Sequence, residues 1–335
     1  MQNDNEMSNL QVRWFDEWHP ELDEALRLLP EMETCPHELF RMLMVNRTSN
    51  RKRTALVTAR GEPLAVVGLR QKRHHWELVP PDASPEAFLP AAPEAFYPTL
   101  AALGVDLWVW GLAEGAPPPG VARFAQAEPT YKVDCQADYE EHWRETGHIR
   151  VVRSARERTQ GYRLEIDAPG AAEWTIRNWA AKWAARGSDT LSRAEDQIVA
   201  ASYLQPRGQL HTFRLFDDDE PVAGATLVVA GAELIGMSIY SSDAYRKQAV
   251  GTRLMDAIFA WAREAGYRKV ELGTGDGYKA GIAPADGCRW TLNFCPGPAY
   301  AFKRTVRWMA SPLATARMRI AAIAPARIRV QQEAG

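Results

Sequence analysis

The sequence has 335 residues, of which 46% are hydrophobic and 24% are charged, and its formal net charge is −2. This composition excludes bulk disorder, and the charge balance excludes a generally basic nucleic-acid binder. At this length we expect two domains of roughly 150 residues each, in an ordinary globular protein.

Three features bear on location and metal binding. The first residues are polar and include Asp4 and Glu6, unlike a signal peptide. The longest charge-free apolar stretch, Pro221–Ala232, is too short for a membrane span. The cysteines are widely spaced and form no disulfide or metal-ligand pattern. We therefore expect a cytoplasmic protein without a metal.

The first half predicts a helix followed by strands. Leucines at helical spacing indicate a helical stretch over Pro20–Asn46. Two β-branched runs, Thr54–Ala59 and Leu64–Leu69, are separated by a Gly- and Pro-containing turn, which predicts a hairpin. Frequent prolines over 80–98 exclude a long helix there. The elements expected after the hairpin are a strand at His75–Val79, a short helix ending at Leu103 and a strand at Val105–Trp110.

The second half predicts a similar order of elements. The apolar patterns indicate helices at Trp174–Arg186, Arg193–Leu204 and Ala249–Ala265, and strands at His211–Phe216, Val222–Val229, Leu234–Tyr240 and Lys269–Leu272. Four tryptophans lie on predicted apolar helix faces, which favours core packing over ligand contact. They are Trp174, Trp179, Trp183 and Trp261.

The two halves can be overlaid on each other. A shift of 158 residues places Thr54 on Thr212 and the pair Glu62-Pro63 on Glu220-Pro221. The order of the elements is preserved, which favours a diverged duplication, while the small number of matches leaves chance as the alternative.

A candidate phosphate-binding turn precedes the long helix of the second half. The amino end of a helix offers unpaired N–H groups and a positive dipole end, both of which suit a phosphate. Small residues allow an anion to approach the backbone. The alternative is an ordinary surface turn with a solvated Arg-Lys pair. The turn consists of Arg246, Lys247, Gln248, Ala249, Val250, Gly251 and Thr252.

This segment resembles the coenzyme A-binding segment of the GNAT acyltransferase superfamily, whose motif is [QR]-x-x-G-x-[GA]. Here the motif is Arg246-x-x-Ala249-x-Gly251, so an alanine replaces the first glycine. Residues 145–305 are similar to the FemAB-like and cellulose-biosynthesis (CelD-like) acetyltransferase branch. Three further features carry that similarity: the basic stretch Arg150–Arg158, the segment Trp183–Gly187, and the turn Gly273–Lys279 that ends in Tyr-Lys.

The resemblance implies an α/β (α+β) fold of tandem GNAT-like domains, each a mixed, mostly antiparallel sheet flanked by helices. The domains expected are a degenerate GNAT-like domain at 1–135, an acyl-CoA-binding GNAT domain at 136–310 and a basic tail at 311–335. Residues 301–335 hold seven Lys/Arg against one acidic residue, Glu333. This tail is interpreted either as a weak peripheral membrane contact or as a solvated segment.

The resemblance also implies direct transfer of an acetyl or other acyl group from acyl-CoA, a cosubstrate, to an amine of a small-molecule or cell-envelope-related acceptor. Ser238, Ile239 and Tyr240 lie where this family pairs its backbone with the pantetheine arm. Tyr278 is the candidate acid for the departing thiolate; a tyrosine bound only to backbone is the alternative.

Asp276 is the candidate base, with a turn-forming role as the alternative. Asp243 is another candidate base that also suits a helix cap. Lys279 is expected to neutralise a phosphate or an acidic substrate group, or to be solvated.

Two other functions stay open on the sequence. One is a FemAB-type aminoacyltransferase that uses aminoacyl-tRNA, although no long heptad repeat indicates the helical arm usual in such enzymes. The other is a catalytically inactive GNAT-like binding protein. A DNA partner is not expected.

Overall fold

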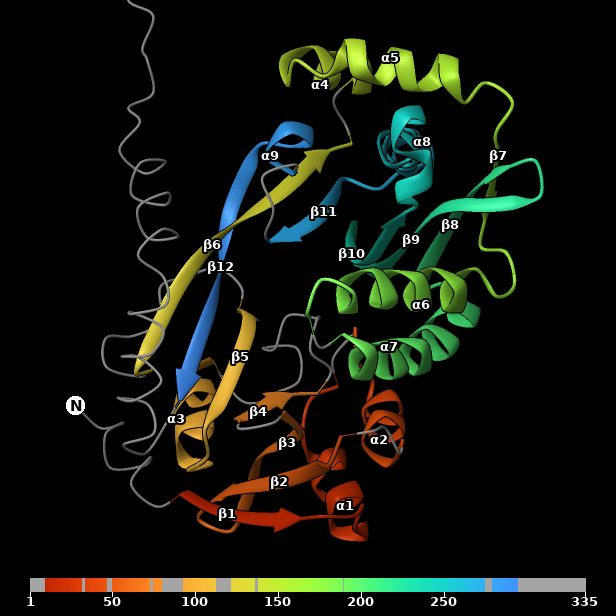
Figure 1. The fold of residues 1–335 in the computed structure, drawn as a ribbon. Helices are drawn as coiled ribbons and strands as arrows, with labels where there is room; N and C mark the ends of the chain where they lie inside the picture. Colours follow the sequence, from red (N-terminus) through yellow and green to blue (C-terminus); the bar gives the residue numbers. More distant parts are fainter. Residues whose placement is uncertain are drawn as a thin grey trace, which may run out of the picture. The chain divides into compact units, whose positions relative to one another are not determined.

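The computed structural model describes residues 10–31, 34–46, 50–72, 75–79, 93–112, 122–135, 138–188, 190–274 and 279–294. These residues lie in one compact unit, Met1–Phe294. Their strands form a single sheet in the order β1-β2-β3-β4-β5-β12-β6-β11-β10-β9-β8-β7 (Figure 1). Within these ranges no helix is long and apolar enough to cross a membrane.

The first half differs from the sequence prediction in its helices. The helical stretch predicted over Pro20–Asn46 consists of two helices in the structure. Leu29 precedes Pro30 and is extended, with φ −103° and ψ 147°, as a residue before proline prefers. The elements of this half are β1 (Leu10–Phe15), α1 (Pro20–Leu28), α2 (His37–Val45), β2 (Lys52–Ala59), β3 (Glu62–Lys72), β4 (His75–Leu78), α3 (Pro93–Ala102) and β5 (Leu107–Leu112).

The second half contains the predicted strand–turn–helix–strand unit, and each helix and strand of the unit begins and ends within two residues of the prediction. The elements are β6 (Phe124–Asp134), α4 (Tyr139–Glu145), α5 (Ile149–Arg158), β7 (Arg163–Ile166), α6 (Ala171–Ala184), α7 (Leu191–Leu204), η3 (Gln205–Arg207), β8 (Leu210–Asp217), β9 (Glu220–Ala230), β10 (Glu233–Ser241), η4 (Asp243–Gln248), α8 (Val250–Glu264), β11 (Lys269–Thr274), α9 (Lys279–Ile282) and β12 (Ala285–Phe294).

The hairpins β2–β3 and β8–β9 are the same structure built twice. Every residue pair of the first hairpin has its counterpart in the second at an offset of 158 residues. The pairing shifts after Val57 in the first hairpin and after Leu215 in the second, which is the same position at that offset. The overlay predicted from the sequence is therefore the observed register.

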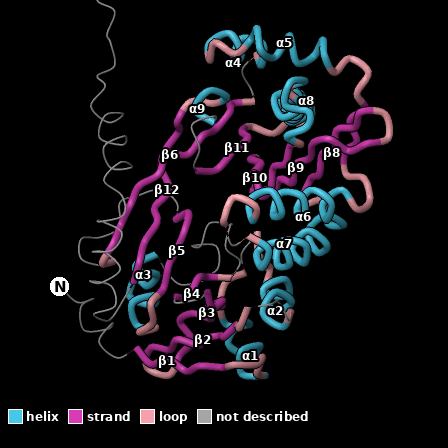
Figure 2. The backbone as a smooth tube through the Cα atoms, in the orientation of Figure 1, coloured by secondary structure: helices cyan, strands magenta, loops and turns pink. Residues whose placement is uncertain are grey.

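Strands β6 and β12 join the two halves. Strand β12 lies between β5 and β6, and β6 in turn pairs with β11, all antiparallel. The late strand β12 thus extends the sheet of the first half, and the earlier strand β6 extends that of the second half. Their pairing is why both halves share one sheet (Figure 2).

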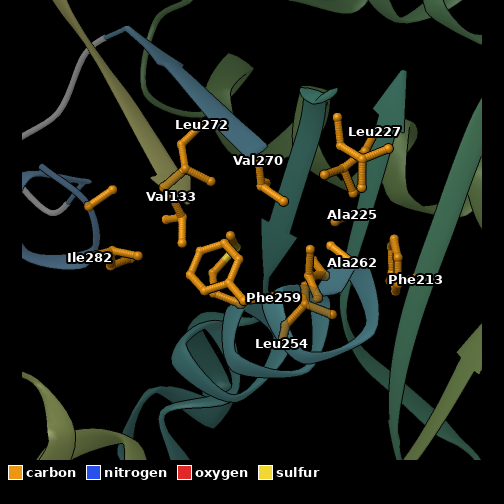
Figure 3. Close-up of a cluster of buried hydrophobic side chains, with 14 of the residues drawn as sticks. Val133, Phe213, Ala225, Leu227, Leu254, Phe259, Ala262, Val270, Leu272 and Ile282 are labelled. Atoms are coloured by element: carbon orange, nitrogen blue, oxygen red, sulfur yellow. The ribbon is translucent and has the colours of Figure 1, made fainter. Parts of the chain in front are cut away.

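Helices cover the two faces of the second half of the sheet. Helix α8 packs on one face and α6 on the other, as Figure 1 shows. The α8 side chains Leu254, Phe259 and Ala262 are fully or almost fully buried and meet Val270 and Leu227 of the sheet (Figure 3). This apolar contact fixes α8, and hence the turn before it, against the strands.

Candidate functional site

Strands β10 and β11 are neighbours in the second half of the sheet, and they separate part of the way along their length. They pair in parallel only over Glu233–Ile235 and Lys269–Glu271, although β10 continues to Ser241 and β11 to Thr274. In β10 the register with β9 shifts between Gly236 and Ser238. An irregularity of this kind bends a strand and increases its twist. Past it, β10 remains joined to β9 and diverges from β11.

A cavity of about 480 Å³ lies where the strands separate. This volume is within the range of small-molecule sites. Both strands line the cavity, as do α6, α7 and the strands β5 and β12. The residues of β10 and β11 in its wall are Ile235, Gly236, Met237, Ile239, Glu271, Leu272, Gly273 and Thr274.

The predicted phosphate turn lies directly between β10 and α8. Ala249 is the residue that caps α8, and it has left-handed backbone angles, with φ 56° and ψ 41°. Its side chain makes no capping hydrogen bond. The first amide groups of a helix have no acceptor within the helix, so those of α8 remain available to an anion.

Gly251 lies beside the end of β10. A Cβ atom at this position would lie 3.3 Å from Oγ of Ser241, at the end of β10. This distance is shorter than an ordinary van der Waals contact. The second small residue of the motif therefore lets α8 start beside the strand without a side chain between them.

The side chains of the three residues predicted to lie along the pantetheine arm, Ser238, Ile239 and Tyr240, have different surroundings. Ile239 lines the cavity. Ser238 is buried, and its Oγ donates to Oε1 of Gln197 over 2.9 Å. The Tyr240 ring meets the ring of Trp174 edge-on at 5.5 Å between centroids. Of the three side chains, only that of Ile239 is part of the cavity wall.

The charged residues of the turn face solvent. Arg246 and Lys247 are exposed, and Nη1 of Arg158 on α5 donates to the carbonyl of Lys247. Gln248 has a buried Oε1 without a hydrogen-bond donor among the described residues. Thr252 is half-buried, whereas Val250 belongs to the core beneath α8. Basic groups thus surround a turn that the core holds in place.

Lys279 and Asp243 differ in their relation to the cavity. Lys279 lines it, and its Nζ donates to the carbonyl of Thr274 over 2.5 Å. Asp243 is exposed, and Nζ of Lys182 lies 2.8 Å from its Oδ1. The hydrogen bond from Lys182 lowers the pKa of Asp243. Asp243 is therefore an ionised partner of Lys182, and it is not part of the cavity wall.

The candidate acid Tyr278 and the candidate base Asp276 lie outside the described residues. The residues on either side of them, Thr274 and Lys279, both line the cavity.

Sequence reasoning missed several residues of the cavity wall. Trp179 and Trp183 were expected in the core; Trp179 packs against it, and both are half-buried and line the cavity. Two features of the sequence could have indicated the cavity wall. They are the charged Glu271 within an apolar strand and the cationic residues that follow Trp183 along the chain. The cavity-wall side chains that were not predicted from the sequence are Trp110, Trp179, Trp183, Arg193, Glu271 and Arg289.

Glu271 is a buried carboxylate that two cations hold. Nε of Arg289 donates to its Oε1 over 2.7 Å, and Nζ of Lys132 lies 3.6 Å from its Oε2. Arg289 also donates from Nη1 to the carbonyl of Gly111 in β5. Because both contacts of Arg289 fix its guanidinium, β5 and β11 are linked through one side chain at the cavity wall.

Part of the chain matches a known family of domains. Residues 147–280 match the profile of a family described as acetyltransferase (GNAT) domain. The predicted resemblance to GNAT acetyltransferases is therefore supported over these residues. The FemAB-like and CelD-like branch stays a prediction. A comparison with curated proteins found no significant match.

Solved structures share the fold over most of the chain. The C-terminal domain of a provisionally named lysylphosphatidylglycerol synthetase from Agrobacterium fabrum is 15% identical, with a TM-score of 0.51, and the match covers 85% of this chain and 95% of that one. A conserved protein of unknown function from Bacteroides thetaiotaomicron is 9% identical, with a TM-score of 0.52 and coverage of 84% and 99%.

A tandem GNAT protein from the clavulanic acid biosynthesis pathway is 12% identical, with a TM-score of 0.47, and covers 86% of this chain and 100% of its own. At these identities the likenesses concern the fold alone. The fold is a mixed α/β fold with a large sheet flanked by helices, as predicted, and the two hairpins with the same register agree with the predicted tandem arrangement.

Proposed function

We propose that the protein is an N-acyltransferase that transfers an acetyl or other acyl group from acyl-CoA to an amine of a small-molecule or cell-envelope-related acceptor. The observation that carries this proposal is the divergence of β10 from β11 directly before the uncapped amino end of α8. A strand edge and a phosphate-binding turn in series suit a ligand with a pantetheine arm and a pyrophosphate.

The two parts of the site would act on different parts of acyl-CoA. The N–H groups of the first turn of α8, with the positive end of its dipole, would hold the pyrophosphate. The backbone edge of β10 around Ile239 would pair with the amides of the pantetheine arm. The thioester would then lie in the cavity between β10 and β11.

For this transfer the protein needs only to orient the amine and the thioester and to accept and donate protons. The amine nitrogen forms a bond to the thioester carbon, the C–S bond breaks, and the thiolate takes a proton. Asp276 is proposed to receive the proton of the amine and Tyr278 to donate one to the thiolate. The unperturbed pKa of a tyrosine is about 10, so a phenol is protonated and able to donate near neutral pH.

Titration calorimetry with acetyl-CoA tests the proposal. We expect wild-type protein to bind acetyl-CoA and Gly251→Leu to lose at least about tenfold in affinity, equivalent to about 1.4 kcal/mol. The side chain added at Gly251 would project beside Ser241 and occupy the approach to the turn.

The matched control is Ala181→Leu, which adds the same side chain to an exposed position of α6 and should leave the affinity unchanged. Leucine is a better helix former than glycine, so an effect of Gly251→Leu would not reflect a weaker helix. No binding of acetyl-CoA to the wild-type protein at millimolar concentration would overturn the proposed function.

A further inference from the structure

One wall of the cavity is apolar. Its half-buried apolar side chains come from β10 and α6, and they are Ile235, Met237, Ile239, Trp179 and Trp183. Met237 and Trp179 also pack against one core cluster, which holds them in position. Covering a partly accessible apolar surface with a further apolar group is favourable, so this wall suits an apolar part of a ligand.

The charged side chains of the cavity wall are paired within the chain. Nε of Arg289 donates to Glu271, and Nζ of Lys279 donates to a backbone carbonyl. Nη2 of Arg193 lies 3.5 Å from Oε1 of Glu77. Charges that the protein already compensates do not call for a charged group on the ligand. The cavity is therefore better suited to an apolar group than to a second charge.

The proposed binding of acyl-CoA directs the acyl group toward Gly236. With the pyrophosphate at the amino end of α8 and the pantetheine arm along β10, the arm runs from Ser241 toward the start of the strand. At Gly236 the strands lie close together, because a Cβ atom there would be 3.3 Å from the carbonyl oxygen of Glu271 in β11. The pairing of Glu233–Ile235 with Lys269–Glu271 closes the sheet beyond that point. The acyl group therefore has to leave the plane of the sheet.

The face of the sheet beneath α8 is filled. Leu254 and Ile258 of α8 and Val270 of β11 are each completely buried in one core cluster, and such interiors are close-packed. On the opposite face of the sheet, α6 brings Trp179 and Trp183 to the cavity (Figure 1). An acyl chain would therefore continue along the apolar wall.

We propose that the acyl group that this protein transfers is apolar and larger than acetyl, and that it lies against Met237, Trp179 and Trp183. This inference rests on the proposed function and narrows its donor substrate. An acetyl group adds only a methyl group to the thioester carbonyl and would leave most of a cavity of about 480 Å³ unfilled. An aliphatic chain and an aromatic ring share the chemistry that this wall recognises.

A series of acyl-CoA thioesters tests the size and the type of the acyl group. We would titrate the protein by calorimetry with acetyl-CoA, hexanoyl-CoA and phenylacetyl-CoA in the absence of an acceptor. At least one of the larger thioesters is expected to bind at least about tenfold more tightly than acetyl-CoA, since burial of each methylene group strengthens binding about fourfold. The thioester with the larger preference shows whether the acyl group is aliphatic or aromatic.

Variants of Trp183 then locate the preference. In Trp183→Ala the preference over acetyl-CoA should fall at least about threefold, because the acyl group loses one apolar contact surface. Trp183→Phe keeps an apolar ring and should retain most of the preference. Thermal unfolding would show that each variant is folded.

The matched control is Trp174→Ala on the same helix. Trp174 is half-buried and meets the ring of Tyr240 edge-on, and it is not part of the cavity wall. Its loss should leave the wild-type preference unchanged, even where the affinity for all the thioesters changes alike.

Equal binding of acetyl-CoA and both larger thioesters, or weaker binding of the larger ones, would overturn the proposed acyl group. A preference that stays the same in folded Trp183→Ala would also overturn it, because the acyl group would then lie elsewhere. Failure of the proposed function has a different result, since acetyl-CoA and the larger thioesters would then all fail to bind.

Discussion

At the scale of single residues, Ala249 is where the chain departs from the motif that it resembles. Left-handed backbone angles cost an L-residue about 1–2 kcal/mol, and glycine avoids most of that cost. The φ of 56° at Ala249 shows that the structure keeps the turn that the glycine of the motif would favour. Alanine in place of glycine therefore lowers the stability of the turn but does not change its backbone shape.

Ala249→Gly should stabilise the protein by about 0.5–1 kcal/mol, since it relieves this strain, although glycine also gains freedom in the unfolded chain. Urea unfolding would measure the change. Ala181→Gly, at an exposed helical position of α6, is the control and should destabilise by about 1 kcal/mol. Equal losses in the two variants would contradict a strained Ala249.

Helices and strands that are defined by local sequence signals alone could be predicted from the sequence. The β8–β9 hairpin and α8 follow from alternation, turn residues and helical spacing. Strands β6 and β12 were not predicted, because their partners lie far away in the chain and their stability comes from pairing with each other. Trp183 was misassigned for a related reason: periodicity identifies an apolar face of α6 but not whether a cavity lies against it.

Helix α5 shows how one element positions another at the site. Its Arg156 donates to the buried carboxylate of Asp256 on α8 through Nε over 2.8 Å and Nη2 over 2.7 Å. Nε1 of Trp143 on α4 donates to the same carboxylate. Two residues further along α5, Arg158 bonds to the carbonyl of Lys247 in the phosphate turn. The docking of α5 on α8 thus supports the turn from outside.

Arg156→Ala should destabilise the protein by about 2 kcal/mol, because it leaves Asp256 buried with fewer partners. This value is below the range for fully buried pairs, since Arg156 is 29% exposed. We also expect a several-fold loss in acetyl-CoA affinity, measured by calorimetry, because Arg158 is then less well placed.

The control for Arg156→Ala is Arg153→Ala on the same helix. Arg153 is exposed and lies 3.5 Å from Glu140, so its loss should change the free energy of unfolding by less than about 0.5 kcal/mol. If both variants lose the same stability and affinity, the Arg156–Asp256 contact has no special part in supporting the turn.

At the scale of the whole molecule, the two halves are joined both by strands and by buried charge. The sheet runs through β5, β12, β6 and β11 without a break. Beside it, β3 and β4 of the first half contribute Arg70 and Glu77 to a cluster with Asp196 and Arg193 of α7. The sequence shows no sign of this cluster, since the two members from the first half lie more than a hundred residues from the two members in α7. It ties α7 to the first half.

This cluster predicts a specific response to acid. Burial by itself would raise the pKa of Glu77, but the hydrogen bond from His75 and the charges of Arg193, Arg70 and Lys72 outweigh it and lower the pKa from 4.5 to about 2. A lowered folded-state pKa gives stability that is complete above the unfolded value and is lost as the pH falls toward the folded value. The contribution of Glu77 should therefore disappear between about pH 4.5 and pH 2.

Urea unfolding of wild-type protein and Glu77→Gln at two pH values tests this linkage. At pH 7 the variant should be less stable by about 2 kcal/mol, and near pH 2 the difference should fall below about 0.5 kcal/mol, because Glu77 is then about half protonated in the folded wild type and fully protonated in the unfolded chain. Glu62→Gln, an exposed carboxylate at the start of β3, should change the free energy of unfolding by less than about 0.5 kcal/mol at pH 7. A Glu77→Gln deficit that stays the same at both pH values would show that the glutamine disturbs packing and that the charge of Glu77 does not stabilise the junction between the halves.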